Sequence, residues 1–268
     1  MCMYFNYTRA AYYKSIKVGE KTLISESLIM DLVQQERRHQ PRLGRKKLYF
    51  MLHSAIHGID RHFGRDKFFN FLRNHDLLVE RKRQYSRTTN SWHHFHKYGN
   101  KIKDLTLSRP NQVWASDITY VRTEKGFAYL SLITDMYSRK IVGWSLSDNL
   151  SIEGSLSALK KALKTNPLGG RSLVHHSDRG VQYCSYEYVN ILKNNAIEIS
   201  MTEVNHCYEN ALAERVNGIL KDEYLLDSVF KDFTHAQQCC KQAVMLYNTR
   251  RPHWALEFRT PEQVHRVA

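Results

Sequence analysis

The order of apolar patterns after Pro110 constrains the fold of this chain more than any other feature. Strand-like alternation covers three consecutive segments, 112–122, 127–136 and 139–147. Gly126 lies in the first connecting turn and Ser138-Arg139 in the second, as a meander requires. Helical and strand patterns then alternate, with helices expected at 151–164, 185–194, 209–226 and 233–249 and strands at 172–177 and 196–200. The sequence therefore predicts an α/β domain with a mixed five-stranded sheet and flanking helices.

The part before Pro110 has a different pattern. Apolar residues at helical spacing predict three short helices, at 25–39, 44–57 and 65–75. Such a unit suits a helix-turn-helix or winged-helix domain, and it is equally compatible with an ordinary three-helix packing unit. We therefore expect four segments: an N-terminal segment at 1–24, a helix-turn-helix-like domain at 25–79, a linker at 80–110, and a catalytic core with C-terminal helices at 111–268.

Positive charge is concentrated in the first 110 residues. The whole chain has 40 Lys and Arg against 26 Asp and Glu, a net charge of +14. Residues 1–110 hold 22 against 9, whereas residues 111–268 hold 18 against 17. A basic surface on a soluble protein would explain this balance, but one-sided charge favours a polyanionic partner such as DNA. The expected phosphate contacts in this part are Arg45, Lys46, Lys47, Arg65, Lys67, Arg81, Lys82 and Arg83.

The segment 80–110 interleaves basic residues with Tyr85, Trp92, Phe95 and Tyr98. It is interpreted either as a solvated tether or as a segment that follows phosphates and stacks on bases. Its histidines have no paired cysteines nearby, which disfavours a zinc site. The chain has no run of 18 apolar residues, no signal-peptide pattern and five scattered cysteines, so we expect a cytoplasmic protein without a membrane span.

Three carboxylates are the candidate chemical groups, and each has a plain structural alternative. Asp117 lies mid-strand, where a buried carboxylate needs hydrogen bonds, a salt bridge or a cation. Asp178 follows an apolar strand and precedes Arg179-Gly180, residues that are common in turns. The same position is the carboxyl end of a strand, where ligands bind in open α/β sheets. Glu214 lies on a helix whose polar stripe would ordinarily face solvent.

Taken together, the three carboxylates favour a metal site. Their order, strand, strand end and helix, allows them to face one cleft, and oxygen ligands of this kind hold Mg²⁺ or Mn²⁺. Two such ions can serve one phosphoryl-transfer site. Lys221 continues the stripe of Glu214 and is expected to contact phosphate. Further DNA contacts are expected from Arg179, Asn210, Asn217, Arg250, Arg251 and His253, although the last three can instead cap the final helix.

At these residues the chain resembles the transposases of insertion-sequence family three, the OrfB or InsF-like products related to retroviral integrases. The resemblance is carried by WASDITY (114–120), LSLITDMYSRKIVGW (130–144), HHSDRGVQYCS (175–185), SMTEVNHCYENALAERVNGILKDEY (200–224) and YNTRRPHWAL (247–256). Thirty-five residues separate Asp178 from Glu214, the interval typical of this group.

The resemblance implies a ribonuclease-H-like core with Asp117, Asp178 and Glu214 as a metal-binding catalytic triad. It also implies action on terminal inverted repeats and on target DNA in a bacterial, nucleoid-associated setting. A homo-oligomer on DNA and an upstream-frame OrfA partner are implied as well. The expected chemistry is hydrolytic cleavage of one strand followed by attack of its 3′-hydroxyl on another phosphodiester. Two alternatives stay open, a non-catalytic DNA-binding regulator of the element and a ribonuclease acting on RNA–DNA hybrids.

Overall fold

The computed structural model describes residues 8–80, 94–165, 171–203 and 210–267. The chain divides into two compact units, Met1–Arg81 and Lys82–Ala268, which are described separately. None of the helices in the described ranges is both long and apolar enough to cross a membrane.

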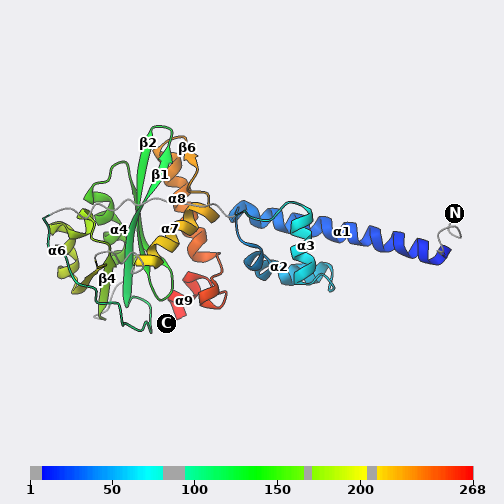
Figure 1. The fold of residues 1–268 in the computed structure, drawn as a ribbon, viewed down its shortest axis with the longest axis horizontal. Coiled ribbons are helices and arrows are strands. Elements are labelled where there is room, and N and C mark those ends of the chain that lie inside the picture. Colours follow the sequence, from blue (N-terminus) through cyan, green and yellow to red (C-terminus); the bar gives the residue numbers. More distant parts are fainter. Residues whose placement is uncertain (1–7, 81–93, 166–170, 204–209, 268) are drawn as a thin grey trace. The chain divides into compact units, whose positions relative to one another are not determined.

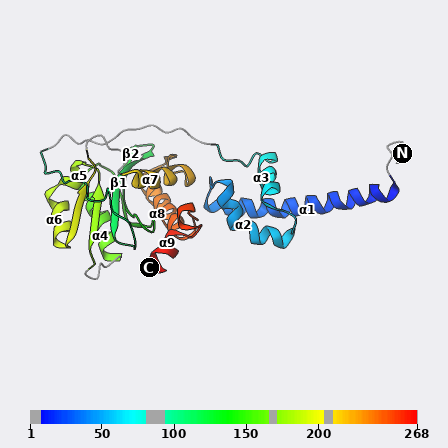
Figure 2. The ribbon, with the colours of Figure 1, turned by 60° about the horizontal axis from the view of Figure 1, so that its bottom comes forward.

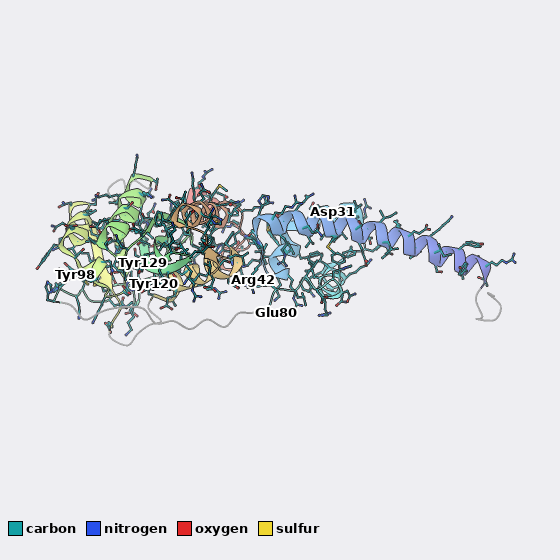
Figure 3. All side chains as sticks on the ribbon, turned by 90° about the horizontal axis from the view of Figure 1, so that it is seen from above. Asp31, Arg42, Glu80, Tyr98, Tyr120 and Tyr129 are labelled. Atoms are coloured by element: carbon teal, nitrogen blue, oxygen red, sulfur yellow. The ribbon has the colours of Figure 1, made fainter. Side chains whose placement is uncertain are left out.

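Unit 1 consists of three helices, α1 (Arg9–His39), α2 (Arg45–Ile59) and α3 (Arg65–Asn74). Apolar side chains from all three form one core, and the largest fully buried ones are Phe63, Phe68, Ile29, Leu43, Leu48, Ile56 and Leu72. The Arg42 guanidinium donates to the carbonyl oxygen of Glu80, which ties the end of the unit to the α1–α2 connection (Figure 3). The three predicted helices are therefore present.

The first helix is longer than the sequence predicted. It begins at Arg9 instead of residue 25, with Thr8 as the N-cap accepting a hydrogen bond from the Ala11 amide. Nearly all of residues 9–24 are exposed, and the buried positions start at Ser25 and continue with Ile29 and Val33. Because this half of the helix buries no apolar face, it leaves no periodic signal in the sequence.

Unit 2 is built on a mixed sheet, shown at the centre of the unit in Figure 1. Its strands are β1 (Val113–Thr123), β2 (Gly126–Asp135), β3 (Ile141–Ser147), β4 (Leu173–Ser177) and β5 (Ile197–Met201). The order is β3-β2-β1-β4-β5, with antiparallel β1–β2 and β2–β3 pairs and parallel β1–β4 and β4–β5 pairs. A sixth strand, β6 (Val229–Phe230), pairs with the end of β1 and was not predicted.

Helices cover both faces of this sheet, as the two views in Figures 1 and 2 agree. One face packs against α4 (Ile152–Thr165), α5 (Val181–Cys184) and α6 (Tyr186–Asn194) around Trp114 and Ile133. The other packs against α7 (Ala211–Glu223) and α8 (Phe233–Thr249) around Val121, Leu130 and Leu132. A 3-10 turn, η3 (Trp254–Leu256), and α9 (Pro261–Val267) follow.

Part of the predicted linker belongs to unit 2. Phe95 and Tyr98 pack against the core on the α4 side of the sheet. The Lys101 amide donates to the Ser200 hydroxyl at 2.9 Å, and the Met201 amide donates to the Gly99 carbonyl at 3.2 Å. Residues 99–101 thus lie along edge strand β5, and the last part of the predicted linker at 80–110 packs on unit 2. Residues 81–93 lie outside the described ranges.

Candidate active site

Asp117 lies in the middle of β1, on the face that meets α7 and α8. Side chains alternate along a strand, so Asp117 shares this face with Val121, whereas Trp114 and Ser116 point to the α4 side. Both carboxylate oxygens of Asp117 accept hydrogen bonds. Oδ1 accepts from the Ile118 amide at 2.9 Å, and Oδ2 accepts from Asn217 Nδ2 on α7 at 2.7 Å.

Asp178 comes next to Asp117 through strand pairing. The parallel β1–β4 ladder places Ser116 opposite Ser177, the last residue of β4, and an aspartate follows each of these two serines. Neighbouring strands lie about 4.8 Å apart, which makes the two carboxylates close neighbours. Asp178 Oδ1 accepts a hydrogen bond from the Gly180 amide at 3.0 Å, and a Cβ at position 180 would lie 3.0 Å from that oxygen. Glycine therefore suits the turn that holds Asp178.

Electrostatics link Asp117 to both of the other carboxylates. Burial, followed by the negative charge of Asp178, raises the pKa of Asp117, which lies at about 7. The hydrogen bonds from Ile118 and Asn217 lower this pKa, and Glu214 makes the smallest contribution, which raises it. Glu214 itself lies in the first turn of α7 and is exposed. The structure thus brings Asp117 and Asp178 together and places Glu214 within electrostatic reach.

The predicted three-carboxylate metal group is not formed. Across residues 8–80, 94–165, 171–203 and 210–267, no three His, Cys, Asp or Glu side chains are arranged so that they could hold a metal ion. The donor chemistry nevertheless fits a hard cation at the Asp117–Asp178 pair. Adjacent carboxylates repel one another in a desolvated place, and a divalent cation bound by oxygen ligands relieves that repulsion. Asp117 and Asp178 are the residues that fit, and Glu214 is not in coordinating position here.

A buried polar cluster lies behind the two aspartates, and the sequence analysis missed it. His175 Nε2 is 2.6 Å from the Ser116 hydroxyl and 2.9 Å from the Tyr188 hydroxyl. Burial, aided by the neighbouring His176, lowers the pKa of His175 to about 3, so its imidazole is neutral. His176 is also buried, with Nδ1 2.9 Å from the Ser200 hydroxyl. His176 is therefore a packed strand histidine.

The structure corrects the predicted DNA contacts on α7. Asn210 and Asn217 are only 5% and 6% exposed, and their amides bond to β1 instead of facing solvent. Lys221 is half-buried on the same helix. Burial lowers the pKa of Lys221, while Asp227 and Asp117 act in the opposite direction, which places its ammonium group within reach of Asp117. The phosphate contact expected of Lys221 stays a prediction.

Two more predicted DNA contacts are buried. Arg251 donates from Nε and Nη2 to the two carboxylate oxygens of Glu223, at 2.7 Å each. Its Nη1 lies 3.0 Å from His253 Nε2, and both residues are under a tenth exposed. The prediction that Arg251 and His253 touch DNA is therefore wrong, since they fasten the end of α8 to α7. Arg250 is exposed and Arg179 half-buried, so the prediction for these two stands untested.

The basic residues predicted in unit 1 are distributed over the starts of two helices. Arg45, Lys46, Arg65 and Lys67 are exposed, and Lys47 is half-buried. Lys67 lies 3.3 Å from Asp60, and Arg65 lies 3.0 Å from Asp66. Ion pairs at the surface are weak, so a DNA phosphate can compete with Asp60 and Asp66 for these basic side chains. The remaining predicted contacts, Arg81, Lys82 and Arg83, lie outside the described residues.

Comparison with known proteins gives a consistent result. The chain matches the integrase core domain over residues 108–207, and a second integrase core domain model over residues 195–261. It is 32% identical to an uncharacterized 31 kDa protein of insertion element IS600 of Shigella sonnei, over 100% of both chains. It is 37% identical to the transposase InsF of insertion sequence IS3A of Escherichia coli K12, over 57% of this chain and 53% of that protein.

A solved structure supports the architecture. The fold is similar to a chain of the simian T-cell lymphotropic virus intasome, with a TM-score of 0.52 and 21% sequence identity. That alignment covers 84% of this chain and 75% of the intasome chain. The integrase-type, ribonuclease-H-like fold predicted from the sequence is therefore confirmed.

Proposed function

Because the chain belongs to the transposases of insertion-sequence family three, we propose that Asp117, Asp178 and Glu214 form its polynucleotidyl-transferase active site. At this site the enzyme cleaves one DNA strand at an element end, and the freed 3′-hydroxyl then attacks a target phosphodiester. The observation that carries the assignment is the side-by-side placement of Asp117 and Asp178 on the α7 face of the sheet, with Glu214 on the facing helix.

The chain's own residues hold the reacting groups. Asn217 and the Ile118 amide orient the Asp117 carboxylate, and the Gly180 amide orients Asp178. Lys221 supplies a positive charge for a neighbouring phosphate, as a point charge on a flexible stem. In strand transfer of this kind the protein contributes positioning and charge neutralisation, and no covalent protein intermediate is needed.

A divalent cation is part of the proposal. Asp117 and Asp178 would hold it, and Glu214 would join them from α7, consistent with one Mg²⁺ or Mn²⁺ ion or a pair. The bound cation supplies charge neutralisation at the transferring phosphoryl group. Burial and the negative charge of Asp178 raise the pKa of Asp117, so a bound divalent cation would favour the ionised form of this carboxylate.

Unit 1 is proposed to bind the element end through phosphate contacts. Its exposed residues Arg45, Lys46, Arg65 and Lys67 carry positive charge at the starts of α2 and α3. Each phosphate contact that is removed lowers the slope of log affinity against log salt by about 0.9 for double-stranded DNA. A variant with Arg45→Ala and Lys46→Ala should therefore lose about 1.8 in slope. We propose in addition a homo-oligomer on DNA, and an upstream-frame OrfA product as a partner.

The catalytic assignment is tested on labelled oligonucleotides that carry an element end. Asp117→Asn and Asp178→Asn should each reduce Mg²⁺-dependent nicking and strand transfer by at least about 100-fold, or about 2.7 kcal/mol of transition-state stabilisation. Glu214→Gln should do the same. Glu198→Gln is the matched control, because Glu198 is an exposed carboxylate of β5 paired with Lys101 at 2.8 Å.

Retention of nicking by Asp117→Asn within twofold of the unsubstituted protein would remove Asp117 from the site. Absence of metal-dependent nicking by the unsubstituted protein, with DNA binding intact, would favour the DNA-binding regulator. Cleavage of an RNA–DNA hybrid in preference to element ends would favour the ribonuclease.

A further inference from the structure

Two buried asparagines fasten α7 to strand β1 beside the proposed active site. Asn210 is the N-cap residue of α7, and its Nδ2 donates to the carbonyl oxygen of Ser116 at 3.2 Å. Asn217 lies two turns further along, and its Nδ2 donates to Asp117 Oδ2 at 2.7 Å. Both side chains are under a tenth exposed. The two amides therefore bond to consecutive residues of one strand.

The spacing of these residues places Glu214 between them. Residues that are three, four and seven positions apart share one face of a helix, so Asn210, Glu214 and Asn217 lie on the same side of α7. The two asparagines fix this side against β1 at both ends of a two-turn stretch. A shift of the helix by one residue would rotate this face by about 100° and translate it by about 1.5 Å. Such a shift would carry Glu214 away from Asp117.

Packing alone does not account for two amides in these positions. The Oδ1 atoms of both Asn210 and Asn217 are buried and have no hydrogen-bond partner. An unpaired buried polar atom costs stability, whereas an apolar side chain of similar volume would not. The surrounding contacts of α7 are apolar, through Val216, Ile219 and Leu220. The amides instead fix the position of α7 along β1, because each N–H donor bonds to one specific oxygen atom of the strand.

We propose that Asn210 and Asn217 are positioning residues, which hold α7 in register on β1 and thereby set where Glu214 stands relative to Asp117 and Asp178. Asn217 has the larger part, because its donor also fixes the orientation of the Asp117 carboxylate. This inference rests on the proposed function, since it presumes that the three carboxylates act together. It replaces the direct DNA contact that the sequence suggested for both residues.

The test compares Asn217→Leu with Asn248→Leu. Asn248, on α8, is a matched control: its amide is also buried and bonds to both backbone groups of Ile141 at 2.9 Å, but it contacts none of the three carboxylates. Both variants should melt at a lower temperature than the unsubstituted protein. Only Asn217→Leu should raise the Mg²⁺ concentration for half-maximal nicking, by about tenfold or more, the loss expected for one hydrogen bond to a charged group.

A second readout does not depend on activity. Binding of Mn²⁺ to the DNA-free protein, followed by electron paramagnetic resonance, should weaken by about tenfold in Asn217→Leu and stay unchanged in Asn248→Leu. Asn210→Leu should shift both readouts in the same direction by a smaller factor. If Asn217→Leu does not fold, Asn217→Ala, which is smaller and removes the donor, takes its place with the same expectation.

The outcomes separate this inference from the function on which it rests. Asn217 variants whose Mg²⁺ requirement and Mn²⁺ affinity match those of Asn248→Leu would overturn the positioning role, while loss of nicking in Asp117→Asn would leave the function standing. Full nicking by Asp117→Asn would instead overturn the proposed active site. A Mg²⁺ requirement that is raised equally in Asn217→Leu and Asn248→Leu would identify a general loss of stability and would also overturn the inference.

Discussion

Replacing Glu223 by glutamine should destabilise unit 2, because it leaves the buried guanidinium of Arg251 without its counter-charge. The two side chains form a bidentate pair with two distances of 2.7 Å, from Nε and from Nη2. The Arg251 side chain is 3% exposed and that of Glu223 is 14% exposed. Removing one partner of such a pair costs more than the pair contributes, since the remaining charge stays buried and unpaired.

The magnitude follows from this burial. Breaking a buried ion pair costs about 3–5 kcal/mol, and the lower end applies here because glutamine still accepts one hydrogen bond. For a domain of about 190 residues, 1 kcal/mol corresponds to roughly 2–4 °C in melting temperature. Glu223→Gln should therefore lower the melting temperature of unit 2 by about 6–12 °C. Combining it with Arg251→Met should recover much of this loss, because no charge is then left unpaired.

Tryptophan fluorescence measures this unfolding selectively. All four tryptophans, at positions 92, 114, 144 and 254, lie in unit 2. Arg250→Met is the control, because it removes a guanidinium from the adjacent, exposed position and should change stability by less than about 0.5 kcal/mol. A Glu223→Gln protein that melts within 2 °C of the unsubstituted chain would refute the reasoning, as would a double variant that is less stable than either single one.

Two further predictions concern stability. The His175 ring lies against Tyr183 and Tyr188, and burial, with a smaller effect of the adjacent His176, lowers the pKa of His175 to about 3, below its unfolded value. As the pH falls, this histidine is protonated in the unfolded chain before it is protonated in the folded one. The free energy of unfolding therefore keeps its full value above about pH 6.5 and is lower by about 2 kcal/mol at pH 5. Denaturant unfolding should show this loss, reduced in His175→Gln; equal pH slopes would contradict it. Gly143→Ala should cost about 1–3 kcal/mol because its Cβ would overlap the Ala158 carbonyl oxygen, whereas Gly218→Ala, with open space around it, should gain about 0.5–1 kcal/mol in thermal unfolding. Equal effects of the two alanines would contradict this contrast.

The parts of the fold that the sequence predicted are those that bury a periodic apolar face. Strands β1 to β5 and helices α2, α3, α4 and α8 lie within a few residues of their predicted ranges, since their apolar side chains repeat with the period of the element. The parts that it missed have no such repeat. Strand β6 has two residues and α9 has seven, too few for a period to be recognised. Nearly all side chains in the first half of α1 are exposed.

The sequence correctly predicted that Asp117 lies within a strand and that Asp178 follows the end of a strand, because strands leave an alternating apolar pattern in the sequence. Pairing of β1 with β4 could not be read locally, yet it is what makes the two aspartates neighbours. His175 and Tyr188 were missed for a related reason. Each looks like an ordinary aromatic residue of an apolar segment, and only the tertiary fold brings their polar atoms to the Ser116 hydroxyl.

The errors on α7 have a physical cause in the surface that this helix meets. Pattern analysis assigns polar side chains to solvent, which is correct when the opposing surface is apolar. Here part of the surface of β1 that α7 meets is polar, because it presents the Asp117 carboxylate and the Ser116 carbonyl group. Polar side chains of α7 are complementary to this polar part of β1. Asn217 is therefore buried against a polar atom of the strand, just as Val216 is buried against apolar side chains. Polar residues on a helix should therefore be judged by the strand that the helix crosses. Those opposite polar atoms of the strand, such as Asn217, are expected to be buried, and those beyond the strand, such as Glu214, are expected to be exposed.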